Sequence, residues 1–334
     1  MTAFLSLRDV SKDYPLARSG PFQPRRWLRA VDNVSLEIRE GETLGLVGES
    51  GCGKSSLARL IVQLEALSRG SISLGGVDLA RLGKAALKQA RRDFQMVFQD
   101  PYASLNPRMK ARAIIGEALR NYRVGDAAQI EARVDELARQ VGLGAYLLDR
   151  FPHELSGGQC QRIGIARAIA LNPRLIVADE AVSALDVSIQ AQILNLIVRL
   201  QAEMGLTLVF VSHDMSVIAH VADRVAVMYL GRIVELGATE TIFARPGHPY
   251  TRTLLAAVPR PTPEARGRRT APAGEMPSPL NPPSGCHFRT RCPHATPRCS
   301  DEVPALRDIG GRSIACHHAE ALLSPNSAPE VVHA

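Results

Sequence analysis

Residues 151–186, FPHELSGGQCQRIGIARAIALNPRLIVADEAVSALD, constrain the fold of this chain more than any other stretch. The first part, LSGGQ, is a polar turn with two adjacent glycines, and it leads into apolar residues at helical spacing. Glycines let backbone N–H groups approach a ligand closely, and a helix that starts there directs its positive end at that ligand. The turn therefore predicts a site for a phosphate group.

The second part of the same stretch predicts a buried parallel strand. Residues 175–178, LIVA, form a short apolar run, and Asp179 and Glu180 follow it directly. Ligands of α/β sheets bind at the C-terminal ends of the strands. We therefore expect these two carboxylates to lie at a ligand site.

Another glycine-rich stretch has the pattern of a P-loop. A strand is expected at residues 43–47 and a helix at residues 57–64, where the apolar residues recur at helical spacing. The backbone N–H groups of such a loop surround phosphates, its lysine reaches the β- and γ-phosphates, and its Ser/Thr hydroxyl binds Mg²⁺. Cys52 is expected to be a small filling residue. The loop between strand and helix has the form GxxxxGK[ST] and consists of Gly48, Glu49, Ser50, Gly51, Cys52, Gly53, Lys54 and Ser55, followed by Ser56.

The two stretches together resemble the ABC ATPases, in which LSGGQ is the signature motif and the strand with Asp179 and Glu180 is the Walker B motif. The resemblance implies an α/β fold: a P-loop NTPase domain of the ABC type with an antiparallel β subdomain and a helical subdomain at about residues 100–165. It also implies ATP hydrolysis, in which Asp179 holds Mg²⁺ and Glu180 is the general base.

Further residues take their expected roles from this resemblance. Without it, Tyr14 would be interpreted as a packing residue, Gln99 as a surface residue and His213 as a structural residue. The signature turn is expected to close over ATP bound to a second subunit, so that two ATP molecules lie between two ATPases. The matching positions are Tyr14 (stacked on adenine), Gln99 (at the metal and the attacking water), His213 (at the γ-phosphate), Asp186 (D-loop), and Ser156, Gly157, Gly158 and Gln159 (signature turn).

Two positions depart from the usual pattern. Most relatives have proline after the catalytic glutamate, where this chain has Ala181, and a basic residue after LSGGQ, where it has Cys160. Neither change removes a catalytic group. We expect Cys160 to remove a positive charge beside the partner's nucleotide and so to weaken closure over ATP.

Hydrophobic periodicity predicts the remaining elements of the domain, which is expected to span residues 4–258. An irregular insert is expected at residues 15–29. Strands are predicted at residues 4–10, 31–38, 94–98 and 207–211, hairpins at 70–82 and 225–236, and helices at 112–122, 127–143 and 189–200.

Residues 259–334 are expected to form a Pro-rich linker and an irregular extension with Cys286, Cys292, Cys299 and Cys316. Their spacing lacks the CxxC pairs of ordinary zinc ribbons. Four thiolates can nevertheless bind an iron–sulfur cluster or a zinc ion. The histidines of this region are alternative ligands, although scattered surface histidines are the simpler interpretation: His287, His294, His317 and His318.

GHPYT, SPLNPPSGC, RCP and ACH resemble the tail of the ATP-binding subunits of dipeptide, oligopeptide and nickel importers. KDYP, QDPYASLNPR and SALDVS resemble the second of the paired ATPases of a bacterial dipeptide importer. The resemblance implies a [4Fe–4S] cluster, with zinc as the alternative. It further implies two transmembrane permeases, a homologous second ATPase in a heterodimer, and an external solute-binding protein. The sequence does not identify the transported solute.

Composition limits the remaining alternatives. No apolar run approaches the roughly 18 residues of a membrane span. With this, the resemblance to importer subunits implies a peripheral subunit on the cytoplasmic face of the bacterial inner membrane. The net charge is +7, but the chain has no dense basic block, so no nucleic-acid partner is expected. The rival is a soluble ABC ATPase acting on nucleic acid or the ribosome. Such proteins usually hold two cassettes in one chain, whereas this chain has one P-loop and one LSGGQ.

Overall fold

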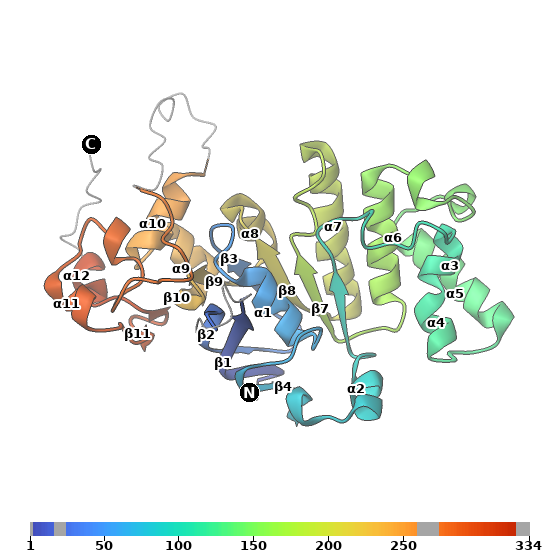
Figure 1. The fold of residues 1–334 in the computed structure, drawn as a ribbon. Coiled ribbons are helices and arrows are strands. Elements are labelled where there is room, and N and C mark those ends of the chain that lie inside the picture. Colours follow the sequence, from blue (N-terminus) through green and yellow to red (C-terminus); the bar gives the residue numbers. More distant parts are fainter. Residues whose placement is uncertain (1–2, 17–24, 259–273, 325–334) are drawn as a thin grey trace.

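The computed structural model describes residues 3–16, 25–258 and 274–324, which form two sheets flanked by helices (Figure 1). In this part of the chain the smaller sheet has four strands in the order β2-β1-β4-β5. All its neighbouring strands are antiparallel, as the ABC resemblance implied. Its strands are β1 (Leu5–Pro15), β2 (Trp27–Ile38), β4 (Arg69–Leu74) and β5 (Val77–Asp78), and the short helix η1 (Leu79–Arg81) follows.

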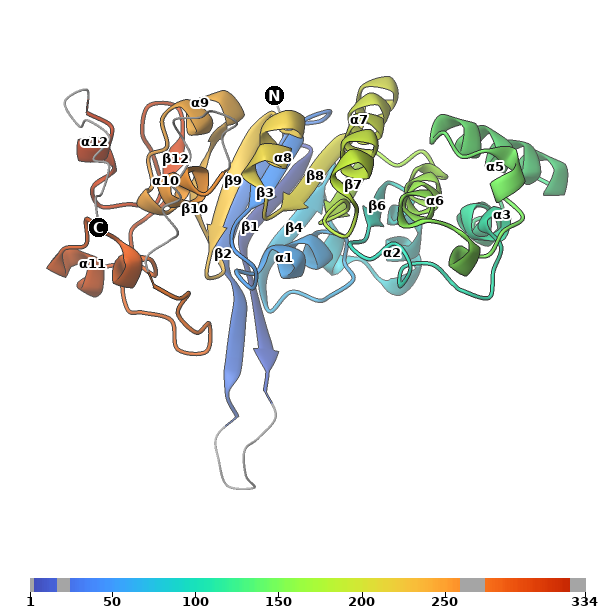
Figure 2. The same cartoon turned by 90° about the horizontal axis from the view of Figure 1, so that it is seen from above.

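The hairpin of β1 and β2 is longer than predicted and projects from the body of the protein (Figure 2). The expected irregular insert at 15–29 is partly strand, because Trp27 pairs with Pro15. Beyond Val10 most residues of β1 are only partly buried and the pairing register shifts. Apolar alternation is therefore absent there, and periodicity could not find the strand. Residues 17–24 of the insert lie outside the described residues.

The larger sheet has the order β11-β12-β10-β9-β3-β8-β7-β6 among the described residues. The strands from β9 to β6 are parallel. β3 and β7 are buried along their whole length, which explains their continuous apolar sequences. The bounds are β3 (Thr43–Val47), β6 (Phe94–Val97), β7 (Leu175–Asp179), β8 (Thr207–Ser212), β9 (Arg224–Tyr229) and β10 (Arg232–Ala238), in agreement with the predicted strands and closing hairpin.

The sheet separates two hydrophobic cores. Leu44 and Leu46 of β3 pack in the core shared with the small sheet, whereas Val47 belongs to the core on the helical side. This is the alternation expected of successive residues in a strand. The helices around the sheet are α1 (Lys54–Ile61), α2 (Lys84–Ala90), α7 (Val187–Met204), α8 (Met215–Val221), α9 (Thr239–Ala244) and α10 (Pro249–Ala256).

The helical subdomain follows β6, as expected. Its α5 is started by a capping box between Asp126 and Gln129, and Ile130, Val134 and Leu137 are buried on one face. The single helix predicted at 112–122 is instead two short helices that meet at Gly116. The helices are α3 (Ala111–Ile115), α4 (Glu117–Asn121), α5 (Ala127–Gln140), η2 (Ala145–Leu147), η3 (Pro152–Glu154) and α6 (Gly157–Ile169).

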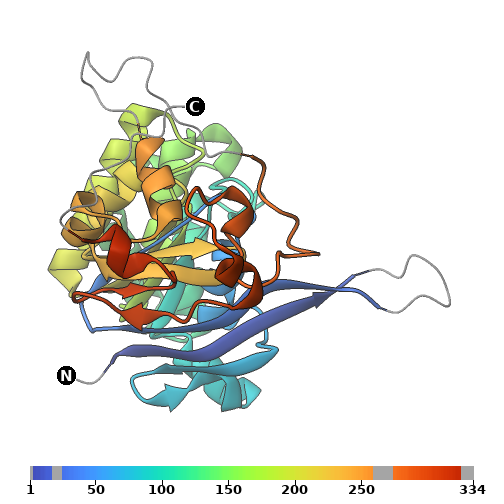
Figure 3. The same ribbon diagram turned by 90° about the vertical axis from the view of Figure 1, so that its left-hand side faces the viewer.

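The C-terminal extension is less irregular than predicted and packs against the edge of the larger sheet (Figure 3). Its strand β12 pairs with β10, where Ile314 lies opposite Glu235. The buried Glu235 carboxylate accepts hydrogen bonds of 2.7 and 3.0 Å from the backbone N–H groups of Gly247 and His248. The elements are η5 (Arg289–Arg291), α11 (Pro297–Asp301), β11 (Arg307–Asp308), β12 (Ser313–Ile314) and α12 (Ala319–Leu322).

Residues 259–273 of the predicted linker lie outside the described residues. Among the helices that are described, none combines the length and the apolar character needed to cross a membrane.

Candidate nucleotide site

The glycine-rich loop lies between the end of β3 and the start of α1. Gly51 and Gly53 have φ angles of 79° and 108°, in the region that favours glycine. A Cβ on Gly53 would also lie 2.1 Å from the carbonyl oxygen of Ala30. The loop can therefore follow this path only with glycine at position 53. Gly53 is also the N-cap of α1, so the loop ends at the N-terminus of this helix.

The Lys54 side chain lies across the loop. It is 4% exposed, and its ammonium donates hydrogen bonds of 2.7 and 3.0 Å to the carbonyl oxygens of Gly48 and Glu49. A positive charge is thus held among the backbone groups that the P-loop pattern assigns to phosphate. The nearby Cys52 thiol is buried, and burial raises its pKa, which fits a filling residue.

Two of the three residues predicted to bind Mg²⁺, Ser55 and Asp179, lie in contact, whereas the third, Gln99, is hydrogen-bonded to Glu180. The Ser55 hydroxyl donates a hydrogen bond of 2.9 Å to Oδ1 of Asp179, joining the first turn of α1 to the end of β7. Burial raises the pKa of Asp179, and the charge of Glu180 raises it further. A hydroxyl and a carboxylate are oxygen ligands of the kind Mg²⁺ prefers, so the donor set fits this ion.

Glu180 is held with its backbone in the left-handed region, at a φ of 47°. Such a conformation costs a non-glycine residue on the order of 1–3 kcal/mol and needs support from its surroundings. Its N–H donates a hydrogen bond of 3.0 Å to Val211. Oε2 accepts a hydrogen bond of 2.8 Å from Gln99, and Oε1 lies 3.5 Å from Nδ1 of His213. The structure thus brings together the predicted base, the predicted glutamine and the predicted histidine.

Tyr14 lies at the margin of the same loop. Its hydroxyl is 3.4 Å from that of Ser56 and is hydrogen-bonded to Glu65. Burial and the hydrogen bond to Glu65 raise the pKa of Tyr14. The structure places the ring near the phosphate loop, and its stacking on adenine stays a prediction.

The signature turn is formed as predicted but lies apart from the loop. Ser156 is the N-cap of α6 and forms a capping box with Gln159, and Gly157 and Gly158 occupy the first turn. α6 packs against β6, whereas the loop leaves β3, three strand positions away and thus about 14 Å. Figure 1 shows the same separation of α6 from α1. Asp186 is exposed at the start of α7.

The expected direction of the side chain at position 160, toward a partner's nucleotide, was wrong, and an effect of Cys160 on closure over ATP stays a prediction. Its side chain is 0% exposed, and its thiol contacts the carbonyl oxygen of Pro152 at 3.5 Å. Position 160 is one turn beyond the N-cap, on the side of α6 that faces the core. Burial raises the pKa of the Cys160 thiol to about 11. A charge at this position would point into the protein and not at a partner's nucleotide. Ala181 is buried as well.

Sequence reasoning missed two residues that contact the loop from the C-terminal side. The Glu49 N–H donates a hydrogen bond of 2.8 Å to the Tyr250 hydroxyl, and the Glu49 carboxylate receives two hydrogen bonds from Arg291. Both residues lie in sequences already noted, GHPYT and RCP, but nothing in their spacing indicates contact with a loop some 200 positions earlier.

The four cysteines of the extension lie in one region. Burial, together with the neighbouring thiols of Cys316, Cys286 and Cys299, raises the pKa of Cys292 to about 12. Among the described residues, however, no three His, Cys, Asp or Glu side chains are arranged to hold a metal ion. One alternative ligand, His318, has Nε2 3.7 Å from Sγ of Cys299.

Comparison with known proteins agrees with this geometry. Residues 31–183 match the family described as ABC transporter, and residues 234–299 match the oligopeptide/dipeptide transporter C-terminal region. The probable peptide ABC transporter ATP-binding protein y4tS of Sinorhizobium fredii is 52% identical over 97% of this chain and 94% of its own. This chain belongs to the ABC transporter ATP-binding proteins.

Other relatives place this ABC protein in the predicted branch. The oligopeptide transport ATP-binding protein OppF of Escherichia coli is 51% identical over 90% of this chain and 91% of its own. The di/tripeptide transport ATP-binding protein DppF of Pseudomonas aeruginosa is 47% identical over 97% of this chain and all of its own. The resemblance inferred from the sequence is thereby confirmed.

Solved structures confirm the fold. The ATP-binding cassette MJ0796, in a dimeric post-hydrolysis state with ADP and Pi, matches with a TM-score of 0.63 and 30% identity over 70% of this chain and 98% of its own. As a member of the ABC family, the chain is expected to bind ATP and Mg²⁺.

Proposed function

We propose that this protein is the ATP-hydrolysing subunit of a bacterial importer of di- or oligopeptides. The observation that carries the proposal is the junction of β3, β6, β7 and β8, where one site combines Lys54, Ser55, Asp179, Glu180 and Gln99. An intact base and an intact P-loop lysine argue against a module that holds ATP without hydrolysing it. The peptide specificity rests on the relatives named for oligopeptide and di/tripeptide transport.

The site supplies what phosphoryl transfer to water needs, which is charge neutralisation and a positioned nucleophile. Lys54 neutralises charge on the β- and γ-phosphates, and Ser55 and Asp179 would hold Mg²⁺, which would supply further positive charge at the site. Glu180 accepts the proton of the attacking water, a contribution of about 10²–10⁴ in rate. Gln99 and His213 flank its carboxylate and orient the water and the γ-phosphate.

The separation of the signature turn from the loop supports a dimer. Ser156 and the glycines after it cannot close over the loop of their own chain, so they complete the site of a second ATPase. ATP binding then closes the pair and hydrolysis reopens it. A homologous second subunit in a heterodimer is the favoured arrangement.

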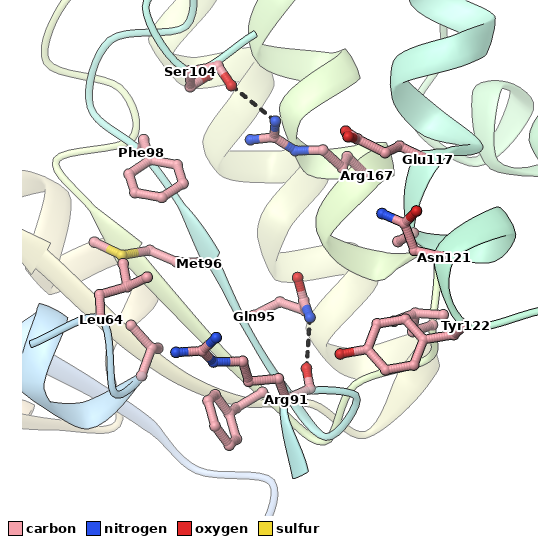
Figure 4. Close-up of a pocket in the computed structure, with 14 residues that line it drawn as sticks. Leu64, Arg91, Gln95, Met96, Phe98, Ser104, Glu117, Asn121, Tyr122 and Arg167 are labelled. Carbon is pink, nitrogen blue, oxygen red and sulfur yellow. Dashed lines mark hydrogen bonds between the residues drawn. The ribbon is translucent and has the colours of Figure 1, made fainter. Parts of the chain in front are cut away.

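The permeases are proposed to dock at the helical subdomain. A hollow of about 340 Å³ lies between β6, α4 and α6 (Figure 4). Met96 and Phe98 give it an apolar side, and Arg167, which donates a hydrogen bond of 2.8 Å to Ser104, lies beside Glu117. A short helix of a transmembrane permease could pack on the apolar side of this hollow and place polar groups near Arg167 and Glu117. The protein would thus lie at the cytoplasmic face of the inner membrane, below permeases supplied by an external binding protein.

A [4Fe–4S] cluster is proposed for the extension, with Cys286, Cys292, Cys299 and Cys316 as ligands. The thiols are close enough to raise one another's pKa, although no group among the described residues is arranged to hold a metal ion. Four thiolates can bind the iron atoms of one cluster, and a zinc ion is the alternative. The role of the bound group would be structural.

Purification from native membranes in mild detergent, followed by mass spectrometry, tests the proposed function. Recovery of two multi-span permeases together with a second LSGGQ protein is the expected result. Recovery only from the soluble fraction, with ribosomal or nucleic-acid partners, would favour a soluble ABC ATPase instead.

A further inference from the structure

The phosphate loop contains a carboxylate that by itself opposes ATP binding. Glu49 directly follows the first glycine of the loop, and its backbone carbonyl is a hydrogen-bond partner of the Lys54 ammonium. An unpaired negative charge on a residue of the phosphate loop would weaken the attraction of the loop for phosphates. Neutralising this carboxylate should therefore favour ATP binding.

Arg291 supplies the neutralising charge from the C-terminal extension. Its Nη1 and Nη2 donate hydrogen bonds of 3.0 and 3.1 Å to the two carboxylate oxygens of Glu49. Such paired hydrogen bonds fix orientation as well as charge. The Arg291 side chain is 4% exposed and that of Glu49 is 23% exposed, so solvent screens the pair less than it screens a surface ion pair.

Arg291 is itself held by aromatic rings. Its guanidinium lies 5.9 and 5.8 Å from the ring centroids of Tyr229 and Phe288. Tyr250 packs on both of these rings, at 4.6 and 5.4 Å, and its hydroxyl accepts the hydrogen bond from the N–H of Glu49. One cluster thus holds Glu49 at its carboxylate and at its backbone.

We propose that Arg291 is a positioning residue for ATP, which neutralises Glu49 and makes the cysteine-bearing extension a part of the nucleotide site. The proposal rests on the proposed function in that the loop binds ATP. Arg291 directly precedes Cys292, so the segment that presents its guanidinium is continuous with the four-cysteine unit. The extension therefore acts on the phosphate loop through charge as well as through packing.

The test compares the affinity of the full chain for a fluorescent ATP analogue with Mg²⁺ among the parent, Arg291→Gln, Glu49→Gln and the double variant. Arg291→Gln leaves the carboxylate unpaired and should weaken binding on the order of tenfold. Glu49→Gln removes the negative charge and leaves the arginine, so binding should exceed that of the parent. The double variant should return to within about threefold of the parent.

Two further variants separate charge from structure. Arg298→Gln removes an exposed ion pair with Glu302 beside another cysteine of the extension, and it should bind the analogue like the parent. Arg291→Lys keeps the charge without the paired geometry, and it should recover part of the affinity lost in Arg291→Gln. If Arg291→Gln proves unstable, Arg291→Lys and the double variant still test the proposal, because neither has an unpaired carboxylate at Glu49.

The outcomes are distinct. If Arg291→Gln binds like the parent, or if the double variant binds as weakly as Arg291→Gln, the charge role is refuted and the arginine only packs. If the parent itself binds no ATP analogue, the proposed function fails, and this proposal falls with it.

Discussion

The side-chain amide of Gln99 donates a hydrogen bond of 2.8 Å to the carboxylate of Glu180, across 81 positions of sequence. The contact follows from sheet order, because Gln99 comes shortly after β6, Glu180 comes directly after β7, and these strands are parallel neighbours. Gln99 also leads into the helical subdomain. The hydrogen bond therefore connects the predicted base to the start of the helical subdomain.

Glu180→Gln should abolish ATP turnover and keep ATP binding. The substitution preserves shape but removes the group that accepts the proton from water, so hydrolysis should fall by about 10²–10⁴. Phosphate release and analogue binding measure the two effects separately. Glu203→Gln, on the exposed face of α7, is the matched control and should hydrolyse ATP like the parent. Unchanged hydrolysis in Glu180→Gln would show that another group is the base.

Lys54→Ala should remove ATP binding without unfolding the protein. The buried ammonium is the positive charge of the loop, and its two carbonyl partners lose about 1 kcal/mol of hydrogen bonding each. The analogue titration and a thermal melt check both statements. Lys88→Ala, an exposed change on α2, should alter neither. Retained affinity in Lys54→Ala would place the phosphates elsewhere.

His248 should make the fold sensitive to acid. It is buried, Nδ1 accepts a hydrogen bond from the N–H of Tyr250, and burial lowers its pKa from 6.5 to about 3. Above pH 6.5 the ring is neutral in both states. Between pH 6.5 and about 3 the unfolded chain binds a proton that the folded protein does not. The free energy of unfolding therefore decreases as the pH is lowered, by about 2 kcal/mol from pH 6.5 to 5.

His248→Asn keeps a side-chain acceptor at the N-cap of α10 and removes the titrating ring. Its melting temperature should therefore fall less between pH 7 and 5 than that of the parent. The exposed His153→Asn should show the parent's pH dependence. Equal slopes for the parent and His248→Asn would mean that other groups carry the acid sensitivity.

The nucleotide core could be predicted from the sequence because each of its parts is local. The P-loop and the run into Asp179 and Glu180 combine a buried strand with a polar turn, and short-range periodicity reports both. The direction of Cys160 could not be predicted in this way. It depends on which side of α6 faces the core, and that side is fixed by packing against η3 and the rest of the subdomain.

The pairing of Arg291 with Glu49 could not be predicted from the sequence for a related reason. It joins residues 242 positions apart through the packing of Tyr229, Phe288 and Tyr250, and no local pattern encodes such a contact. The predicted length of the β1–β2 hairpin was too short because its outer part is only partly buried and therefore lacks apolar alternation.

Cys292→Ser should remove the proposed cluster and weaken nucleotide binding together. After anaerobic purification the parent should have the visible absorbance and iron content of a [4Fe–4S] protein, and the variant should lose both. Because Cys292 ends the short helix η5 that presents Arg291, its affinity for the ATP analogue should fall as in Arg291→Gln. The control is Cys160→Ser, a buried cysteine outside the extension whose hydroxyl can still donate to Pro152; it should keep the iron and the affinity. If the parent is colourless and contains stoichiometric zinc, the extension binds zinc and not an iron–sulfur cluster. An iron-free Cys292→Ser that binds the analogue like the parent would show that the extension holds Arg291 without help from its cysteines.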